Sequence, residues 1–212
     1  SGKSLCFTLP ALLVDGLSVV VYPLLALMDD QLRRMSEAGV PARAVRGGQS
    51  ARDRARIFAA CRSGDVRCLL ANPEVLATGS VRRELGRMRV GHLVIDEAHC
   101  VSEWGETFRP AYLTLRETID ALAPRAVTAF TATASPPVLD AVTRILFDAR
   151  RPRLVQGDPD RPNIWYSVVH APSKEAALAA IIGGDDGAAV ERPALVFCRS
   201  RKRTEAVARN LA

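Results

Sequence analysis

Five short apolar runs, each followed by a stretch of different periodicity, constrain the fold of this chain more than any other feature. Between these runs, apolar residues recur every three or four positions at 24–35 and 138–146, which indicates amphipathic helices. Strands that alternate with helices are typical of a parallel sheet covered on both faces. The sequence therefore predicts an α/β fold, with strands at Leu17–Val21, Ala42–Val45, 67–71, Val90–Ile95 and 126–131.

A turn-rich, proline-punctuated segment at 148–163 is typical of a linker. We expect a first domain over residues 1–150, a linker over 151–163 and an incomplete second domain over 164–212. In this last part we expect strands at 164–169 and 194–197 and helices from Lys174 and Arg201. Because the chain starts with Ser1 and not with Met, we also expect a fragment whose first strand precedes residue 1.

Composition excludes several classes of protein. With 48% apolar and 25% charged residues in 212, the chain is neither disordered nor fibrous. It has no apolar stretch long enough for a transmembrane helix and no signal-peptide pattern, so we expect a cytoplasmic protein of the bacterial cytosol or nucleoid, with no membrane partner. Five cysteines without a C-x-x-C pair argue against a disulfide framework and a zinc site. The net charge of +6 permits a polyanionic partner such as nucleic acid.

An acidic motif, Asp96-Glu97-Ala98-His99, directly follows the apolar residues 92–95. Hydrolysis of a nucleoside triphosphate needs one carboxylate to hold Mg²⁺ and a second group to position the attacking water. Asp96 and Glu97 suit these roles if the strand delivers them to the carboxyl edge of the sheet. An acidic pair after a strand is also often a solvated turn.

Gly2-Lys3-Ser4 fits the end of a phosphate-binding loop, in which backbone N–H groups and the Lys bind phosphates and the Ser hydroxyl ligates Mg²⁺. The same three residues are common in surface turns. Together with the later strand that ends in Asp-Glu, they favour a nucleotide site. We therefore predict that Gly2, Lys3 and Ser4 bind ATP, that Ser4 and Asp96 ligate Mg²⁺, and that Lys3, Asp96 and Glu97 are catalytic.

Eight segments occur in an order that is specific as a set: 1–11, 19–31, 72–74, 96–102, 104–112, 131–134, 161–164 and 195–201. As a set they resemble the successive motifs of the RecQ family of superfamily 2 helicases, over essentially the whole chain. The most diagnostic segment is 104–112, which is similar to the aromatic-rich loop that RecQ enzymes place after the Asp-Glu-Ala-His box.

The resemblance implies a RecA-like P-loop NTPase fold, with ATP and Mg²⁺ bound between two such domains. It also implies ATP-driven 3′-to-5′ translocation and unwinding of DNA in repair or recombination. The expected partner is DNA, both single-stranded and at duplex junctions; no protein partner is indicated.

Two threonines and a histidine are candidates for coupling ATP chemistry to DNA. His99 closes the acidic motif, and Thr131 and Thr133 follow a predicted strand whose end could meet the same edge. We expect these three side chains to connect the nucleotide pocket with the DNA-facing surface. The alternatives are a hydrogen-bonded histidine at a strand end and ordinary turn threonines.

The predicted DNA-binding residues are Trp104, Phe108, Arg109, Tyr22 and Pro23. The rings of Trp104 and Phe108 suit stacking on unpaired bases, and the Arg109 guanidinium suits pairing with phosphate. Tyr22 and Pro23 stand at the end of a predicted strand and are candidates for backbone contacts to single-stranded DNA. The alternatives are rings that pack the loop onto the domain and, at 22–23, an ordinary strand-to-helix turn.

Four residues depart from the RecQ pattern. Glu103, Glu106 and Thr107 stand where the family usually has Gln, His and Asp, and Arg199 replaces Asn. Carboxylates beside a phosphate backbone repel it, so DNA affinity or coupling is expected to be weaker. A nucleic-acid-stimulated ATPase or DNA remodeller without processive unwinding, and an RNA helicase of the Asp-Glu-Ala-His class, therefore remain as alternatives.

Overall fold

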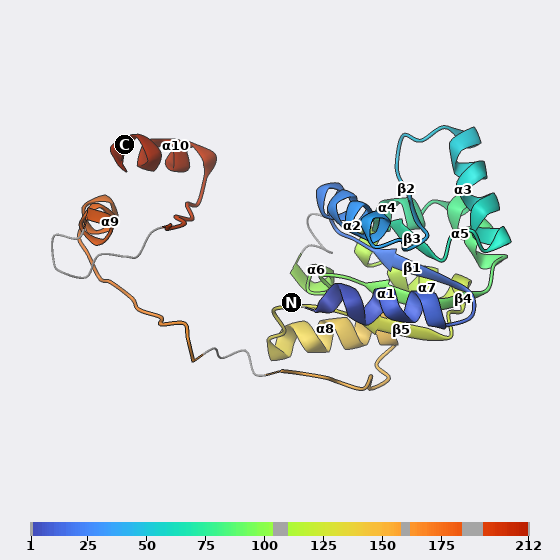
Figure 1. The fold of residues 1–212 in the computed structure, drawn as a ribbon. Helices are drawn as coiled ribbons and strands as arrows, with labels where there is room; N and C mark the ends of the chain where they lie inside the picture. The colour runs from blue at the N-terminus through green and yellow to red at the C-terminus, as the bar shows by residue number, and fades with distance from the viewer. Residues whose placement is uncertain (1, 104–109, 158–161, 184–192, 212) are drawn as a thin grey trace. The chain divides into compact units, whose positions relative to one another are not determined.

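The computed structural model describes residues 2–103, 110–157, 162–183 and 193–211. The chain divides into two compact units, Ser1–Leu154 and Val155–Ala212. In the first, five parallel strands form one sheet in the order β2-β3-β1-β4-β5 (Figure 1). The predicted parallel α/β fold is confirmed, although two strands are shorter than expected. The strands are β1 (Leu17–Val21), β2 (Ala42–Val45), β3 (Cys68–Ala71), β4 (Val90–Ile95) and β5 (Ala126–Ala129).

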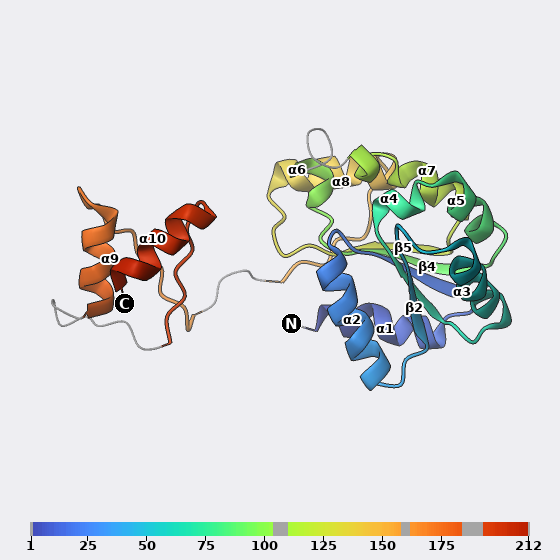
Figure 2. The ribbon, with the colours of Figure 1, turned by 90° about the horizontal axis from the view of Figure 1, so that it is seen from above.

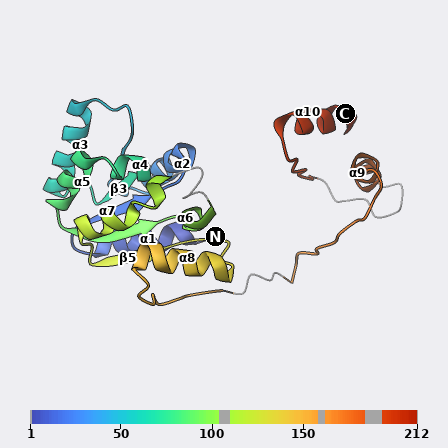
Figure 3. The ribbon, with the colours of Figure 1, turned by 180° about the vertical axis from the view of Figure 1, so that it is seen from behind.

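Helices cover both faces of this sheet. Figure 2 shows α1 and α2 on one side and α4, α5, α7 and α8 on the other. Among them, α7 and α8 pack against each other, as seen from behind in Figure 3. The helices are α1 (Lys3–Leu13), α2 (Leu25–Glu37), α3 (Ala51–Ser63), α4 (Pro73–Leu76), α5 (Gly79–Gly86), α6 (Cys100–Glu103), α7 (Leu115–Leu122) and α8 (Pro136–Phe147), with a short 3₁₀ turn, η1 (Pro110–Tyr112).

The strands bury side chains on both faces, as expected for a central parallel sheet. All five residues of β1 are buried. Val19 and Val21 pack into the core on one face, together with residues of α4, α5, α7 and α8. Val20 and the following Tyr22 pack into a separate core with α1 and α2. The alternation fixes which side chains at the strand ends face α1.

Local signals set the turns that hold the sheet. Ser50 accepts a hydrogen bond from the Asp53 amide at the start of α3, and Gly64 ends that helix with a φ of +85°. Gly16 enters β1 with a φ of +97°, and a Cβ there would lie 2.5 Å from the Arg89 carbonyl oxygen. Only glycine fits this close approach of the turn before β1 to the residue before β4.

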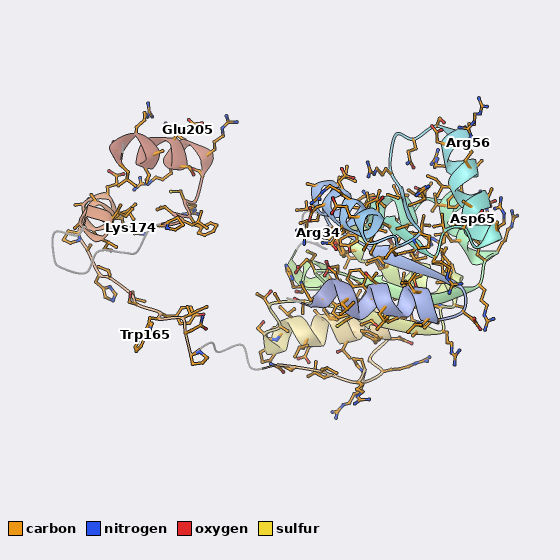
Figure 4. All side chains as sticks on the ribbon, in the orientation of Figure 1. Arg34, Arg56, Asp65, Trp165, Lys174 and Glu205 are labelled. Carbon is orange, nitrogen blue, oxygen red and sulfur yellow. The ribbon has the colours of Figure 1, made fainter. Side chains whose placement is uncertain are left out.

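The second unit contains α9 (Lys174–Gly183) and α10 (Arg201–Leu211), as predicted, but no strand among its described residues. The expected strands at 164–169 and 194–197 are therefore wrong for this structure. An isolated extended segment leaves its backbone groups without a ladder and its apolar side chains without cover. Trp165 is 91% exposed on such a segment (Figure 4), and Phe197 is 93% exposed.

None of the helices in the described part of the chain has both the length and the apolar composition needed to cross a membrane.

Candidate nucleotide-hydrolysis site

The end of β4 delivers the acidic motif to the carboxyl edge of the sheet. The Asp96 amide donates to the Val21 carbonyl at 3.0 Å, and the Ala98 amide donates to the Phe130 carbonyl at 2.8 Å. The motif is thus anchored to both neighbouring strand ends. Glu97 between them has a φ of +49°, a left-handed conformation that costs a non-glycine residue about 1–3 kcal/mol. Strain of this kind is typical of functional turns.

Helix α1 brings the predicted phosphate-binding lysine to the same place. Lys3 is the first residue of α1, and its Nζ lies 2.8 Å from Oε1 of Glu97 and 3.6 Å from Oδ1 of Asp96. The three predicted catalytic groups therefore meet, although Lys3 precedes Asp96 by 93 positions in the sequence. Gly2 is the N-cap of α1, and its carbonyl accepts from the amides of Leu5 and Cys6.

Burial and charge compete at these groups. Burial alone lowers the pKa of Lys3, but its hydrogen bond to Glu97 and the charges of Asp96 and Glu97 outweigh this effect and raise that pKa. Burial raises the pKa of Asp96, against the opposing effect of the Lys3 charge. The lysine is thus a firmly held cation, whereas the Asp96 carboxylate is short of compensating charge. A second cation beside it would favour its ionised form.

The two predicted magnesium ligands fit a metal that is shared with a nucleotide. Oδ1 of Asp96 is buried and has no hydrogen-bond partner among the described residues, so the carboxylate keeps acceptor capacity for a hydrogen-bond donor as well as for a cation or its water shell. The Ser4 hydroxyl donates to Oε1 of Gln31 at 2.9 Å. The described residues contain no group of three or more His, Cys, Asp or Glu arranged to hold a metal ion by themselves. Mg²⁺ commonly takes only one or two protein oxygens plus substrate phosphates, so this donor set fits it.

The predicted coupling residues form a continuous chain of contacts. Nδ1 of His99 lies 3.3 Å from Oε2 of Glu97 and 3.0 Å from Oγ1 of Thr131. The Thr131 hydroxyl donates to the Thr133 carbonyl at 2.9 Å and accepts from the Thr133 amide at 3.1 Å. Since the hydroxyl proton is used there, His99 donates from Nδ1 to Thr131. A path of polar contacts thus runs from Glu97 to the loop after β5.

The predicted DNA-binding residues divide into two groups. Trp104, Phe108 and Arg109 lie outside the described residues. Tyr22 is only 1% exposed and Pro23 is buried, so neither side chain is available to DNA. The end of β1 turns the Tyr22 ring into the core beneath α1 and α2. The contact predicted for these two positions is made by the backbone, so it stays a prediction. Tyr112, which follows this segment in η1, is fully buried.

Gln31 is the contact that sequence reasoning missed. It lies on α2 and holds the hydroxyl of Ser4, so it joins the phosphate-binding helix to a second helix. The helical spacing at 24–35 placed Gln31 on a helix, but it carried no information about which residue of α1 that helix would face. A polar residue within an apolar stripe was the only signal.

Comparison with known proteins gives one family and a consistent set of relatives. Residues 1–142 match the DEAD/DEAH box helicase family. The chain is 32% identical over 211 residues to the ATP-dependent DNA helicase RecQ of Pasteurella multocida, covering 100% of this chain and 33% of that protein. It is 33% identical over 201 residues to the probable ATP-dependent DNA helicase RecS of Bacillus subtilis, covering 95% of this chain and 40% of the relative. The chain thus spans about a third of the length of these curated relatives.

Solved structures agree on the fold. The DUF1998 helicase MrfA bound to DNA and AMPPNP matches with a TM-score of 0.69 at 18% identity, over 99% of this chain and 32% of that one. The Hef helicase domain of Pyrococcus furiosus matches with a TM-score of 0.51 at 21% identity, over 69% of this chain and 31% of that one. At these identities the likeness concerns the RecA-like arrangement of the sheet and helices.

Proposed function

Because the chain belongs to the DEAD/DEAH box helicase family and is similar along its whole length to RecQ DNA helicases, we propose that it is the ATP-hydrolysing part of an ATP-dependent DNA helicase of RecQ type. The observation that carries the proposal is the meeting of Lys3, Asp96 and Glu97 at the carboxyl edge of the sheet. Ligands of open α/β sheets bind at this edge.

Each residue of the cluster has a physical role in hydrolysis. Lys3, now on Glu97, turns to the phosphates of bound ATP and stabilises the charge that develops on the transferred phosphoryl group. Its departure frees Glu97 to orient the attacking water and accept its proton. Ser4 and Asp96 hold Mg²⁺, which when bound neutralises charge on the phosphates. His99 contacts Glu97 and Thr131 and passes the state of the site to the loop after β5.

The finer parts of the proposal are the direction and the substrate. We infer 3′-to-5′ translocation on single-stranded DNA and opening of duplex junctions, in repair or recombination. These parts draw support from the names of the RecQ relatives and from the resemblance of the motif order. The segment 104–109 contacts the unpaired strand in this proposal. The protein acts in the bacterial cytoplasm, where its DNA lies.

A second candidate is a DNA-stimulated ATPase that remodels DNA without processive unwinding. Glu106 and Thr107, which stand where the RecQ family usually has His and Asp, favour it because they change the charge beside the proposed DNA contact. An RNA helicase of the Asp-Glu-Ala-His class is a third, and the resemblance of residues 104–112 to RecQ disfavours it.

The test measures ATP hydrolysis and strand separation by the full protein. Single-stranded DNA should stimulate hydrolysis at least about tenfold, and single-stranded RNA should do so much less. A partial duplex with a 3′ overhang should be opened, whereas a partial duplex of the same length with a 5′ overhang should not. The Lys3→Ala variant is the matched control, since it retains the fold but lacks the phosphate-binding cation.

Each outcome separates two candidates. Hydrolysis that DNA does not stimulate contradicts the helicase proposal. Stimulated hydrolysis with no strand separation supports the remodelling ATPase. Stimulation by RNA alone supports the RNA helicase, and opening of the 5′-overhang duplex contradicts the proposed direction.

A further inference from the structure

A buried phenol lies beside the proposed metal site and has no role in the chemistry described above. Tyr22 follows β1 as Asp96 follows β4, and the two strands are adjacent and parallel with Val21 opposite Ile95. The next pair along this register is Tyr22 and Asp96. Because side chains alternate along strands, Tyr22 shares its face with Val20, and Asp96 shares its face with Val94. Val20 and Val94 belong to the same core beneath α1 and α2.

The Tyr22 hydroxyl and the Oδ1 atom of Asp96 are both buried. Among the described residues, the Tyr22 hydroxyl has no partner and neither does Oδ1 of Asp96. The Lys3 ammonium lies 3.6 Å from that oxygen, which is an ion pair but too long for a hydrogen bond. A phenol is a donor and a carboxylate oxygen is an acceptor, so the two deficits are complementary. Buried polar groups without partners are rare because each costs free energy.

The charge of Asp96 acts on the Tyr22 hydroxyl, in agreement with the closeness of the two side chains. Burial raises the pKa of Tyr22 first, and the negative charge of Asp96 raises it further. The phenol therefore stays protonated and remains a hydrogen-bond donor.

We propose that Tyr22 is a positioning residue for the magnesium site, whose hydroxyl donates a hydrogen bond to Oδ1 of Asp96 when Lys3 moves to the phosphates of bound nucleotide. In the nucleotide-free chain, Lys3 provides the positive charge beside Asp96. Once the lysine leaves, the phenol holds the carboxylate in place and leaves its second oxygen for the metal. The inference rests on the proposed function, because it assigns a residue to the same nucleotide site.

The test compares Tyr22→Phe with the unmodified full protein. A fluorescent non-hydrolysable ATP analogue is titrated with Mg²⁺ present and, separately, in EDTA. Tyr22→Phe should raise the Mg²⁺ concentration for half-maximal binding roughly 10- to 100-fold, the effect of one hydrogen bond to a charged group. Affinity for the analogue in EDTA should change by less than about twofold. The matched control, Tyr112→Phe, removes a buried hydroxyl on the opposite face of the sheet and should leave the Mg²⁺ dependence unchanged.

Folding provides a second signature. Since the hydroxyl has no hydrogen-bond partner among the described residues of the nucleotide-free chain, Tyr22→Phe should unfold at the same temperature or a higher one. If Tyr22→Phe lowered the affinity for the analogue equally with Mg²⁺ and in EDTA, the side chain would have a packing role and the inference would be overturned. So would a variant whose Mg²⁺ dependence equals that of the unmodified protein.

A probe that keeps the hydroxyl makes the test independent of the variant's folding. 3-Fluorotyrosine at position 22 should change its ¹⁹F chemical shift when Mg²⁺ and the analogue are added together, and less when the analogue is added in EDTA. An unchanged resonance contradicts the inference. If Mg²⁺ does not change the binding of the analogue to the unmodified protein, the proposed function fails together with the inference. If Mg²⁺ strengthens binding to the unmodified protein and to Tyr22→Phe equally, only the role of Tyr22 fails.

Discussion

The two units of the chain carry similar sequence signals and reach different structures. In Ser1–Leu154, apolar runs pair into a five-stranded sheet with buried strands. In Val155–Ala212, the apolar runs at 164–169 and 194–197 remain unpaired within the described residues, and only the helices form. A helix closes its own hydrogen bonds, whereas a strand needs a neighbour for them. The comparison teaches that a helical pattern is enough to form a helix, whereas an apolar run forms a strand only beside a neighbouring strand.

The largest expected effect lies at the catalytic edge of the sheet unit. Glu97→Gln should lower the rate of ATP hydrolysis at least about 100-fold, because an amide cannot accept the proton of the attacking water. ATP binding should be kept, because Lys3 loses only its ion pair with Glu97, which competes with the phosphates for the ammonium group. Steady-state hydrolysis and nucleotide-binding titrations measure the two effects. Glu37→Gln, an exposed surface change, is the control; unchanged turnover in Glu97→Gln would remove this residue from its role.

A pair of core substitutions tests the comparison directly. Leu69→Ala, at a fully buried position of β3, should lower the free energy of unfolding by about 3 kcal/mol. Phe197→Ala, at an exposed position of the second unit, should change it by less than about 0.5 kcal/mol. Urea denaturation followed by circular dichroism measures both. Equal losses of unfolding free energy in the two variants would mean that Phe197 is buried in solution. The two units would then differ less than their structures indicate.

A cap in each unit gives a smaller effect. Ser50→Ala removes the hydrogen bond to the Asp53 amide and should cost about 1 kcal/mol of unfolding free energy. Ser200→Ala removes a similar bond to the Arg203 amide at the start of α10. Because the described residues of its unit form no sheet on which α10 could pack, this change should reduce the helical signal without shifting the main unfolding transition. A shift of that transition by Ser200→Ala would show that the second unit unfolds together with the first.

The smallest expected effect is a pH dependence in the core of the sheet unit. Burial lowers the pKa of His92, which bonds to Thr128 through Nε2 and has no partner at Nδ1 among the described residues. The folded state therefore binds fewer protons than the unfolded state below the ordinary pKa of 6.5. Stability from this group is complete above pH 6.5 and falls as the pH falls through that value towards the lowered pKa.

His92→Gln should flatten that dependence in urea denaturation between pH 5 and pH 8. His170→Gln, an exposed change in the second unit, is the control and should keep the dependence of the unmodified protein. The interpretation is wrong if His92→Gln loses as much stability at acid pH as the unmodified protein does.

Sequence patterns predicted much of the fold and the centre of the site. The strand at Val90–Ile95 was predicted with its observed bounds, and the motif after it does reach the edge where Lys3 lies. The apolar run carried this information, because a parallel strand delivers the residues that follow it to the carboxyl edge of the sheet. The sequence could not reveal that Tyr22 turns inward. A tyrosine at a strand end is compatible with either face, and only the sheet order decides what it meets.

The sequence by itself determined the alternation of strands and helices and the residue types that handle phosphate, since both follow from local periodicity and chemistry. Only the tertiary structure decided which of these residues meet. The order β2-β3-β1-β4-β5 places β1 beside β4 and so Tyr22 beside Asp96, while α1 carries Lys3 to the same edge. Such contacts join residues far apart in the chain, and no local pattern encodes the neighbour that a strand will choose.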